Sequence, residues 1–165
     1  MRDGPVDNAK LAIYRRLPRR LQVLAARHGT PNFTIGTIGL ITHDGSDLLL
    51  VRPSYRNGWV PPGGFVGVGE TPLEALSREI QEELGVRMEF GPAHRVAFDV
   101  ARRGVTFVSA ALAPGDAEFR VRTRELEEVG WFPIDDLPPL PHDFFEGVPE
   151  EDLEALRRLG SGRRG

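Results

Sequence analysis

The chain has 165 residues, a formal net charge of −3 and no cysteine, which suits one domain with a full hydrophobic core. The lack of cysteine excludes disulfides, thiolate metal sites and a cysteine nucleophile and suits a reducing, cytoplasmic location, while the small negative charge gives no general case for nucleic-acid binding. No apolar run reaches the ~18–20 residues of a membrane span, and the charged N-terminus lacks the apolar region of a signal peptide, so we expect neither.

Residues 8–28 are predicted to be helical, because leucine, isoleucine, valine and tyrosine side chains recur there at roughly helical spacing. Pro18 should divide this stretch into two helices, since its ring clashes with the preceding turn. The first 30 residues hold seven basic side chains against two acidic ones. We therefore treat residues 1–30 as a helical extension whose basic face is solvated, contacts an anionic substrate or forms a homodimer contact.

A two-stranded hairpin is predicted next. Residues 33–42 are β-branched and continuously apolar, which predicts a strand that is buried on both faces. Residues 43–46 have Asp-Gly at their centre, which is typical of a hairpin turn, and residues 47–52 are predicted to return as the partner strand. A polar loop at 53–58 then leads into Trp59.

A glycine-rich loop and an acidic helix follow. Thr71 and Glu74 have the spacing of a capping box, with Pro72 at the first helical position, where proline is tolerated best. Gly85 is placed to end the helix in the left-handed conformation. The predicted helix therefore covers residues 72–84.

Two neighbouring edges of this helix differ in chemistry. Its apolar side chains fall within one arc of about 80° and are expected to pack on the sheet. They are Leu73, Leu76, Ile80 and Leu84. Glu79, Glu82 and Glu83 share the adjacent arc, about 100° wide. Three carboxylates on one edge repel one another, so a cation is expected among them.

The expected cation is a hard divalent ion, Mg²⁺ or Mn²⁺, because the donors are carboxylate oxygens with no imidazole or thiolate nearby. Gly63 and Gly64 permit close approach of the backbone, and the Gly63 carbonyl would complete an oxygen shell. Arg78 is placed to neutralise and orient the nearby glutamates. A solvated acidic helix face is the alternative, but it does not explain the capping box, the double glycine or Glu70 ahead of the helix.

The rest of the pattern predicts a mixed, mainly antiparallel sheet with a C-terminal helix, which is an α/β layered domain. Strands are predicted at residues 86–90, 94–100, 105–113 and 129–133, with a short edge strand at 119–122 and an acidic loop at 123–128. Residues 149–159 have proline and acids early and arginines late, which suits the helix dipole. Residues 161–165 are expected to be a flexible tail.

The spacing of the central stretch resembles the Nudix box. The stretch reads Gly64, five residues, Glu70, seven residues, then Arg78-Glu79-Ile80-Gln81-Glu82-Glu83-Leu84-Gly85-Val86. Every specified position of Gly-x5-Glu-x7-Arg-Glu-U-x-Glu-Glu-x-Gly-U, with U aliphatic, is matched. The resemblance covers roughly residues 33–140 and implies a Nudix-type α/β/α sandwich at 31–160, with the N-terminal helices as an addition.

The resemblance implies a hydrolase that cleaves the pyrophosphate bond of a nucleoside diphosphate linked to another group, with Mg²⁺ or Mn²⁺ as cofactor. It implies oxygen ligands for the metal at Gly63 (carbonyl), Glu70, Glu79, Glu82 and Glu83. Arg78 would act as a clamp on these glutamates.

The sequence leaves two places for the general base, the helix and the late acidic loop. The resemblance implies Glu79 or Glu82 for this role, or an acid of residues 123–128. Among the late acids we favour Glu125, which lies six residues before Trp131.

Substrate contacts are predicted at residues beside the glycine loop, namely Arg52, Arg56, Trp59 and Gly64. Subfamily markers for ADP-ribose and for diadenosine polyphosphates would fall near Arg102, and neither is present. The remaining substrates are nucleoside triphosphates, CDP-alcohols and nucleotide sugars.

Two other functions fit these residues less well. A non-catalytic Nudix-fold nucleotide-binding module would have a degraded box, and an isomerase of the isopentenyl diphosphate type would need a catalytic cysteine. We therefore expect an active pyrophosphohydrolase with a small-molecule nucleotide substrate and no membrane or nucleic-acid partner.

Overall fold

The computed structural model describes Pro18, residues 32–141 and residues 148–162. The predicted N-terminal helices lie outside the described residues. The chain divides into two units, Met1–Phe33 and Thr34–Gly165, and the second contains the strands and helices described below. None of the helices in the described part of the chain is long and apolar enough to cross a membrane.

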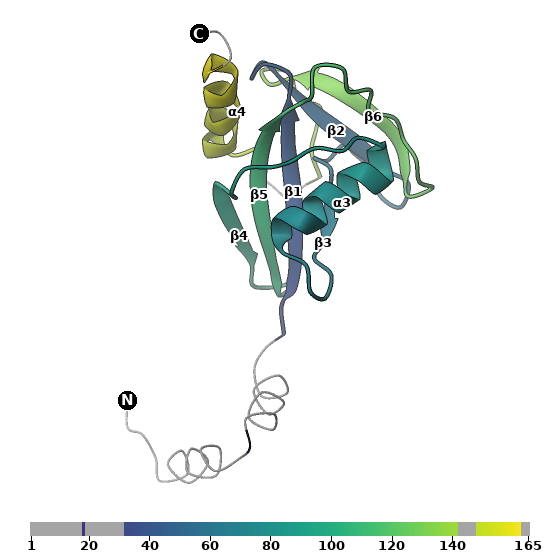
Figure 1. Cartoon of the computed structure of the whole chain (residues 1–165), viewed down its shortest axis with the longest axis vertical. Coiled ribbons are helices and arrows are strands. Elements are labelled where there is room, and N and C mark those ends of the chain that lie inside the picture. Colours follow the sequence, from purple (N-terminus) through teal and green to yellow (C-terminus); the bar gives the residue numbers. More distant parts are fainter. Residues whose placement is uncertain (1–17, 19–31, 142–147, 163–165) are drawn as a thin grey trace. The chain divides into compact units, whose positions relative to one another are not determined.

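Two sheets form the centre of the second unit (Figure 1). The larger has the strand order β3 (Gly63–Phe65), β1 (Thr34–Thr42), β5 (Gly104–Leu112) and β4 (Arg95–Asp99). Strands β1 and β5 are parallel, and the other two pairs are antiparallel. The smaller sheet pairs β2 (Asp47–Pro53) with β6 (Leu126–Pro133) in antiparallel orientation. The predicted α/β class with a mixed, mainly antiparallel sheet is confirmed.

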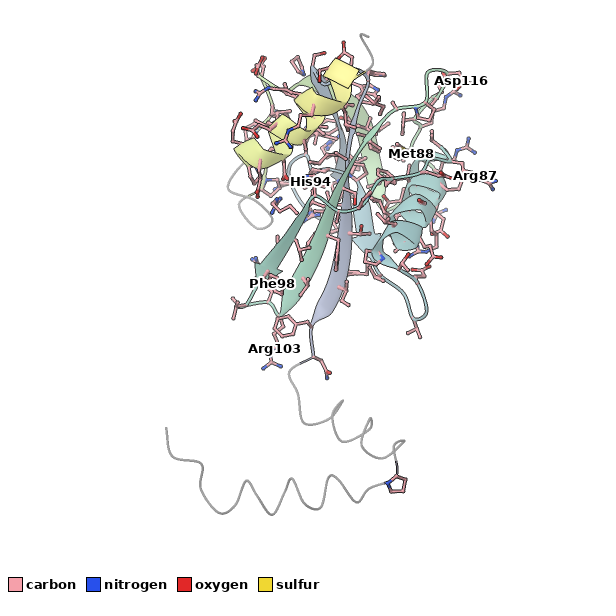
Figure 2. The ribbon with its side chains drawn as sticks, turned by 60° about the vertical axis from the view of Figure 1, so that its left-hand side comes forward. Arg87, Met88, His94, Phe98, Arg103 and Asp116 are labelled. Atoms are coloured by element: carbon pink, nitrogen blue, oxygen red, sulfur yellow. The ribbon has the colours of Figure 1, made fainter. Side chains whose placement is uncertain are left out.

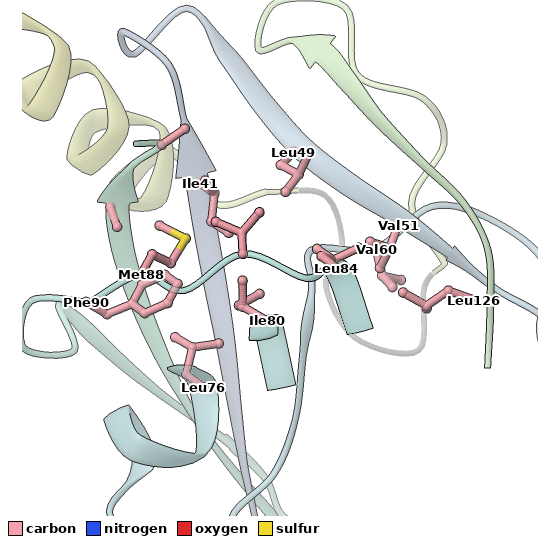
Figure 3. Packing of buried hydrophobic residues seen from close by; sticks show 13 residues of the cluster. Ile41, Leu49, Val51, Val60, Leu76, Ile80, Leu84, Met88, Phe90 and Leu126 are labelled. Carbon is pink, nitrogen blue, oxygen red and sulfur yellow. The ribbon is translucent and has the colours of Figure 1, made fainter. Parts of the chain in front are cut away.

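Two helices cover opposite faces of the large sheet. Side chains alternate between the faces of a strand, so neighbours along β1 join different cores. Ile41 packs with Leu76 and Ile80 of α3 (Pro72–Leu84), as Figure 3 shows. Leu40 packs with Leu156 of α4 (Glu150–Gly162) on the other face. These two cores make the predicted α/β/α sandwich.

Helix α3 has the predicted ends. The Thr71 hydroxyl accepts a hydrogen bond from the Glu74 amide at 3.3 Å, and the Glu74 carboxylate accepts one from the Thr71 amide at 2.8 Å. Gly85 has φ 76° and closes the helix in the left-handed conformation, which costs a glycine little. These bonds satisfy amide and carbonyl groups that a helix leaves unpaired at its ends.

The predicted hairpin between β1 and β2 is wrong. Strand β1 pairs with β3 on one edge and β5 on the other, so no edge is left for β2. Side chains rather than a strand ladder close the turn: the Thr42 hydroxyl accepts from the Gly45 amide at 2.8 Å, and Asp47 accepts from the His43 amide at 2.8 Å. The prediction that this strand is buried on both faces is also wrong at the start of β1, where Ile35 is 43% exposed.

Two predicted strands are absent from the described chain. In residues 86–90, Val86, Met88 and Phe90 are buried while Arg87 and Glu89 are exposed, and Figure 2 shows Arg87 directed outward. This alternation fits a strand, but the backbone of these residues pairs with no neighbouring strand. Alternating apolar and polar residues indicate which side chains are buried, and side chains can be buried in this way without hydrogen bonding of the backbone to another strand.

Residues 119–122 bind the end of α3 instead of a sheet. The amides of Arg120 and Arg122 donate to the carbonyls of Leu84 and Glu83 at 3.1 and 2.8 Å. They satisfy carbonyls of the last helical turn, which have no partner within the helix.

Two later elements are longer than predicted. Strand β6 begins at Leu126, so Glu127 and Glu128 belong to a strand rather than to an acidic loop. Helix α4 continues to Gly162, which moves the start of the predicted tail. The helix packs tightly there, since a Cβ at Gly160 would lie 1.6 Å from the carbonyl oxygen of Asp44, in the β1–β2 turn.

A buried carboxylate attaches α4 to β4. Asp152 is 1% exposed. It accepts two hydrogen bonds from the Arg95 guanidinium at 2.6 and 3.0 Å and lies 2.7 Å from His94 Nε2. This paired geometry compensates the cost of removing the carboxylate from water.

We expect Asp152→Ala to lower the free energy of unfolding by about 3 kcal/mol, because the change leaves the Arg95 charge partly buried without its main partner. Denaturant unfolding would measure the loss. Glu154→Ala, on the exposed side of the same helix, is the control and should cost under ~0.5 kcal/mol, since an exposed ion pair contributes little. Equal losses in both variants would contradict the role given to Asp152.

Candidate active site

Two glycines bring the β3 backbone against α3. A Cβ at Gly63 would lie 2.1 Å from the carbonyl oxygen of Thr37, and a Cβ at Gly64 would lie 2.4 Å from the carboxyl carbon of Glu79. Gly63 leaves no room for a side chain, because the atom that it would meet is backbone and real Cβ contacts are not shorter than 3.0 Å, whereas a side chain at Gly64 would displace the Glu79 carboxylate. The double glycine therefore allows the helix and the loop to meet at Glu79.

Arg78 joins the loop to the acidic edge of α3. Its guanidinium donates to Glu70 at 2.7 and 3.1 Å, to Glu79 at 2.9 Å and to Glu82 at 3.2 Å, and also to the Phe65 carbonyl at 3.2 Å. The hydrogen bonds to Glu70, followed by those to the other two carboxylates, raise the pKa of Arg78. The side chain therefore stays charged and holds three carboxylates in place.

Glu70 closes the glycine loop in this structure. Its carboxylate also accepts a hydrogen bond from the Gly67 amide at 2.9 Å. Arg78, and then the Gly67 amide, hold the pKa of Glu70 below its ordinary value. Its contacts are those of a residue that supports the loop, and its role as a metal ligand stays a prediction.

Glu83 is the buried carboxyl group of the site. It is 9% exposed, and burial raises its pKa to about 7, with further contributions from the charges of Glu79, Glu125 and Glu82. A buried carboxylate close to other carboxylates is costly unless a cation compensates it. Within the described residues, no ion pair reaches Glu83.

Glu125 comes to the helix through the smaller sheet. The register of β2 and β6 shifts between Arg52 and Pro53. Beyond this shift the Ser54 amide donates to the Glu125 carbonyl at 2.8 Å, and the Ser54 hydroxyl donates to the Arg124 carbonyl at 3.1 Å. These bonds hold Glu125, which is exposed, where its charge acts on Glu83. The predicted general base thus lies by the acidic edge of α3.

The predicted substrate contacts are only partly brought together. Arg56 and Gly64 line one pocket with Glu83. Arg52 instead donates to Glu127 and Glu128, each at 2.5 Å, and lines a neighbouring pocket that Arg56 also lines.

Trp59 packs edge-on against Phe132, with ring centroids 4.8 Å apart, and belongs to the core beside α4. Neither pocket is lined by Trp59. Trp59 therefore packs on the core in the described structure, and its contact with a base stays a prediction.

The pocket beside Glu83 has a volume of about 440 Å³. Besides residues of the glycine loop, it is lined by Gly36 of β1, Thr106 of β5 and Ala97 of β4, which our sequence reasoning did not identify. No local signal marks these small residues. They meet only because β1 pairs in parallel with β5, which pairs in turn with β4.

The donor chemistry of the acidic edge fits a hard divalent cation, because it offers only oxygen atoms and leaves a buried carboxylate uncompensated. The carboxylates are not preassembled as a ligand set: within the described ranges, no three acidic or histidine side chains lie together closely enough to hold a metal ion. Glu79 and Glu82 are bonded to Arg78 instead. Metal binding would require them to turn toward Glu83.

The fold and the site together define an α/β protein whose acidic helix faces a pocket, an arrangement suited to a metal ion and a phosphate group. Comparison with known proteins agrees. Residues 32–156 match the model of the NUDIX domain. The chain therefore belongs to the Nudix hydrolase family, and it is a pyrophosphohydrolase in class.

Two curated relatives differ in how much of their length is matched. A putative 8-oxo-dGTP diphosphatase 2 from Mycobacterium tuberculosis is 38% identical over 97 residues, covering 52% of this chain and 69% of that protein. The NAD-capped RNA hydrolase NudC of Escherichia coli is 35% identical over 103 residues, covering 61% of this chain but only 39% of NudC.

Solved structures support the fold. A MutT NUDIX hydrolase from Burkholderia pseudomallei is 32% identical, with a TM-score of 0.62, and covers 76% of this chain and 98% of that one. A UDP-X diphosphatase superimposes with a TM-score of 0.63 at 23% identity, covering 100% of this chain and 87% of that one. At this lower identity the second likeness concerns the fold alone.

The raised pKa of Glu83 predicts that the stability of the folded chain depends on pH. Its carboxyl group has a pKa of about 7 in the folded chain against 4.5 ordinarily, so between these values the folded chain retains a proton that the unfolded chain has lost. The contribution of Glu83 to stability therefore becomes less favourable as pH rises from about 4.5 to about 7.

Without metal, we expect the melting temperature of Glu83→Gln to exceed that of the wild type by a margin that grows as pH rises from 5 to 8, because the glutamine is never charged. Saturating Mg²⁺ should narrow the difference at pH 8, since it binds the wild-type carboxylates. Thermal unfolding of both proteins would measure this. A difference in melting temperature that is independent of pH would contradict the assignment.

Proposed function

We propose that this chain hydrolyses the pyrophosphate bond of a nucleoside diphosphate linked to another group, with Mg²⁺ or Mn²⁺ as cofactor. The observation that carries the proposal is Glu83, a buried carboxyl group that is destabilised by three nearby carboxylates and lines a pocket of nucleotide size. Such a group suits a cation that also binds phosphate.

The metal ligands in this proposal are Glu79, Glu82 and Glu83, with the Gly63 carbonyl. A bound divalent ion would neutralise charge on the phosphate oxygens during attack by water. Arg78 holds the carboxylates of Glu79 and Glu82 by hydrogen bonds before the ion binds.

We assign proton removal from the attacking water to Glu125. This carboxylate lies close enough to act on the charge of Glu83, yet it is exposed and has no ion-pair partner within the described chain. Glu79 and Glu82 are less suited in this structure, because Arg78 holds both carboxylates.

The relatives suggest which nucleotides to test. Their names give 8-oxo-dGTP and NAD-capped RNA as substrates of those proteins. For this chain we propose a small nucleotide, because the pocket of about 440 Å³ is formed within one domain.

A substrate screen tests the proposal. Nucleoside triphosphates with ordinary and oxidised bases, CDP-alcohols, nucleotide sugars and dinucleotides are incubated with Mg²⁺ or Mn²⁺, and released phosphate or pyrophosphate is measured. We expect at least one class to be hydrolysed, with activity lost in EDTA. Failure to cleave any of these compounds, while nucleotides still bind, would favour the non-catalytic binding module.

A further inference from the structure

One row of residues crosses the large sheet beneath the pocket. The strand registers place Phe65 of β3 opposite Gly36 of β1, Gly36 opposite Thr106 of β5, and Thr106 opposite Ala97 of β4. Laterally paired residues face the same side of a sheet, and all four line the pocket. We call Gly36, Thr106 and Ala97 the floor of the pocket.

Gly36 is not required by the backbone or by packing. It is not among the glycines with positive φ. A Cβ at this position would meet only the Gly64 carbonyl and the Thr106 hydroxyl, both at 3.6 Å, which is ordinary contact. On the other face of the same strand, a Cβ at Gly39 would press on the Phe90 ring at 3.0 Å. The missing side chain of Gly36 therefore leaves open space above the floor.

Phe65 does not fill that space. A glycine opposite an aromatic residue often gives the ring a place to pack. Here Phe65 is 68% exposed, so its ring is not buried against Gly36. The aromatic ring instead stands at one end of a floor of small side chains, where a flat ligand can contact it.

The floor has the width of a two-ring base. Neighbouring strands lie ~4.8 Å apart, so Gly36 to Ala97 spans about 10 Å across β1, β5 and β4. Glu83 and Gly64 line the same pocket. A nucleotide whose base lies on the floor can therefore direct its diphosphate to the acidic edge of α3.

We propose that Gly36 is a specificity-determining residue, whose missing side chain admits the flat face of a purine base onto the floor beside Phe65. This inference rests on the proposed function for the position of the diphosphate. It adds that purine nucleotides are preferred to pyrimidine nucleotides and to diphosphates that lack a base.

Equilibrium binding tests the inference without hydrolysis. The probes are the α,β-methylene diphosphates of adenosine, guanosine, cytidine and uridine, with methylenediphosphonate as the base-free probe, all with Mg²⁺. The variant is Gly36→Val. The control is Gly91→Val, because a Cβ at Gly91 meets nothing within 4 Å and Gly91 is not in the pocket lining.

We expect the wild type to bind the purine probes at least ~5-fold more tightly than the pyrimidine probes, and Gly36→Val to weaken purine binding ~10-fold or more. The affinity for methylenediphosphonate should change less than ~2-fold. The melting temperature should not fall, because valine suits a strand better than glycine. Gly91→Val should bind every probe like the wild type.

Three results would overturn the inference: unchanged purine binding in Gly36→Val, equal binding of purines and pyrimidines by the wild type, or an equal loss for methylenediphosphonate. If Gly36→Val does not fold, Gly36→Ala replaces it, and the same purine-selective loss is expected on a smaller scale. Purine binding without hydrolysis would overturn the proposed function alone, whereas hydrolysis with unchanged binding in the variant would overturn this inference alone.

Discussion

Glu83→Gln is expected to lower kcat on the order of 10²-fold on whichever nucleotide the screen identifies, while the fold stays intact. Glutamine has nearly the same shape as glutamate but offers a neutral oxygen, so it cannot replace a carboxylate ligand of a divalent ion. Glu83 is the most buried of the site carboxylates, so water can least readily take its place. Steady-state kinetics with Mg²⁺ varied at fixed substrate would measure the change.

The variant should also require more Mg²⁺ for half-maximal activity, because one ligand is lost. Glu89→Gln is the control, since Glu89 is exposed and lies beyond the C-terminus of α3. Turnover near that of the wild type in both Glu83→Gln and Glu82→Gln would contradict the assignment of the metal ligands.

Arg78→Lys is expected to lower kcat by ~10–100-fold and to reduce the free energy of unfolding by about 2 kcal/mol. A guanidinium donates in several directions in one plane, and here it reaches three carboxylates and the Phe65 carbonyl. An ammonium group is a single point charge on a flexible stem and cannot hold all of these groups together. The side chain is 33% exposed, so solvent screening limits the loss.

Kinetics and denaturant unfolding of the same preparations would separate the two effects. Arg87→Lys is the matched control, because Arg87 is exposed and directed away from the sheet (Figure 2). If Arg78→Lys kept both the wild-type kcat and the wild-type stability, Arg78 would not be positioning the acidic edge.

Local patterns predicted the bounds and the caps of α3 correctly. The capping box, the proline and the terminal glycine act within three or four residues of the helix ends, so their bonds form whatever surrounds them. The placement of Glu79, Glu82 and Glu83 on one edge follows from helical geometry alone. For the same reason Arg78 could be expected beside these glutamates.

Strand pairing was harder to predict than strand formation. The alternation at residues 86–90 reflects burial of Val86, Met88 and Phe90 in the core under α3, and nothing local shows whether a ladder partner exists. The Asp-Gly turn at 43–46 likewise indicates a change of direction. It does not indicate that β1 has both edges occupied by strands from later in the chain.

By itself, the sequence determined the family and reaction class, the acidic edge of α3 and the glycine loop beside it, because these depend on residues close together in the chain. Only the tertiary structure decided what surrounds that edge. It buried Glu83, brought Glu125 to it through the β2–β6 pair, and gave Arg52 and Trp59 other partners. It also assembled Gly36, Thr106 and Ala97 from three strands, because lateral pairing joins residues that the sequence separates.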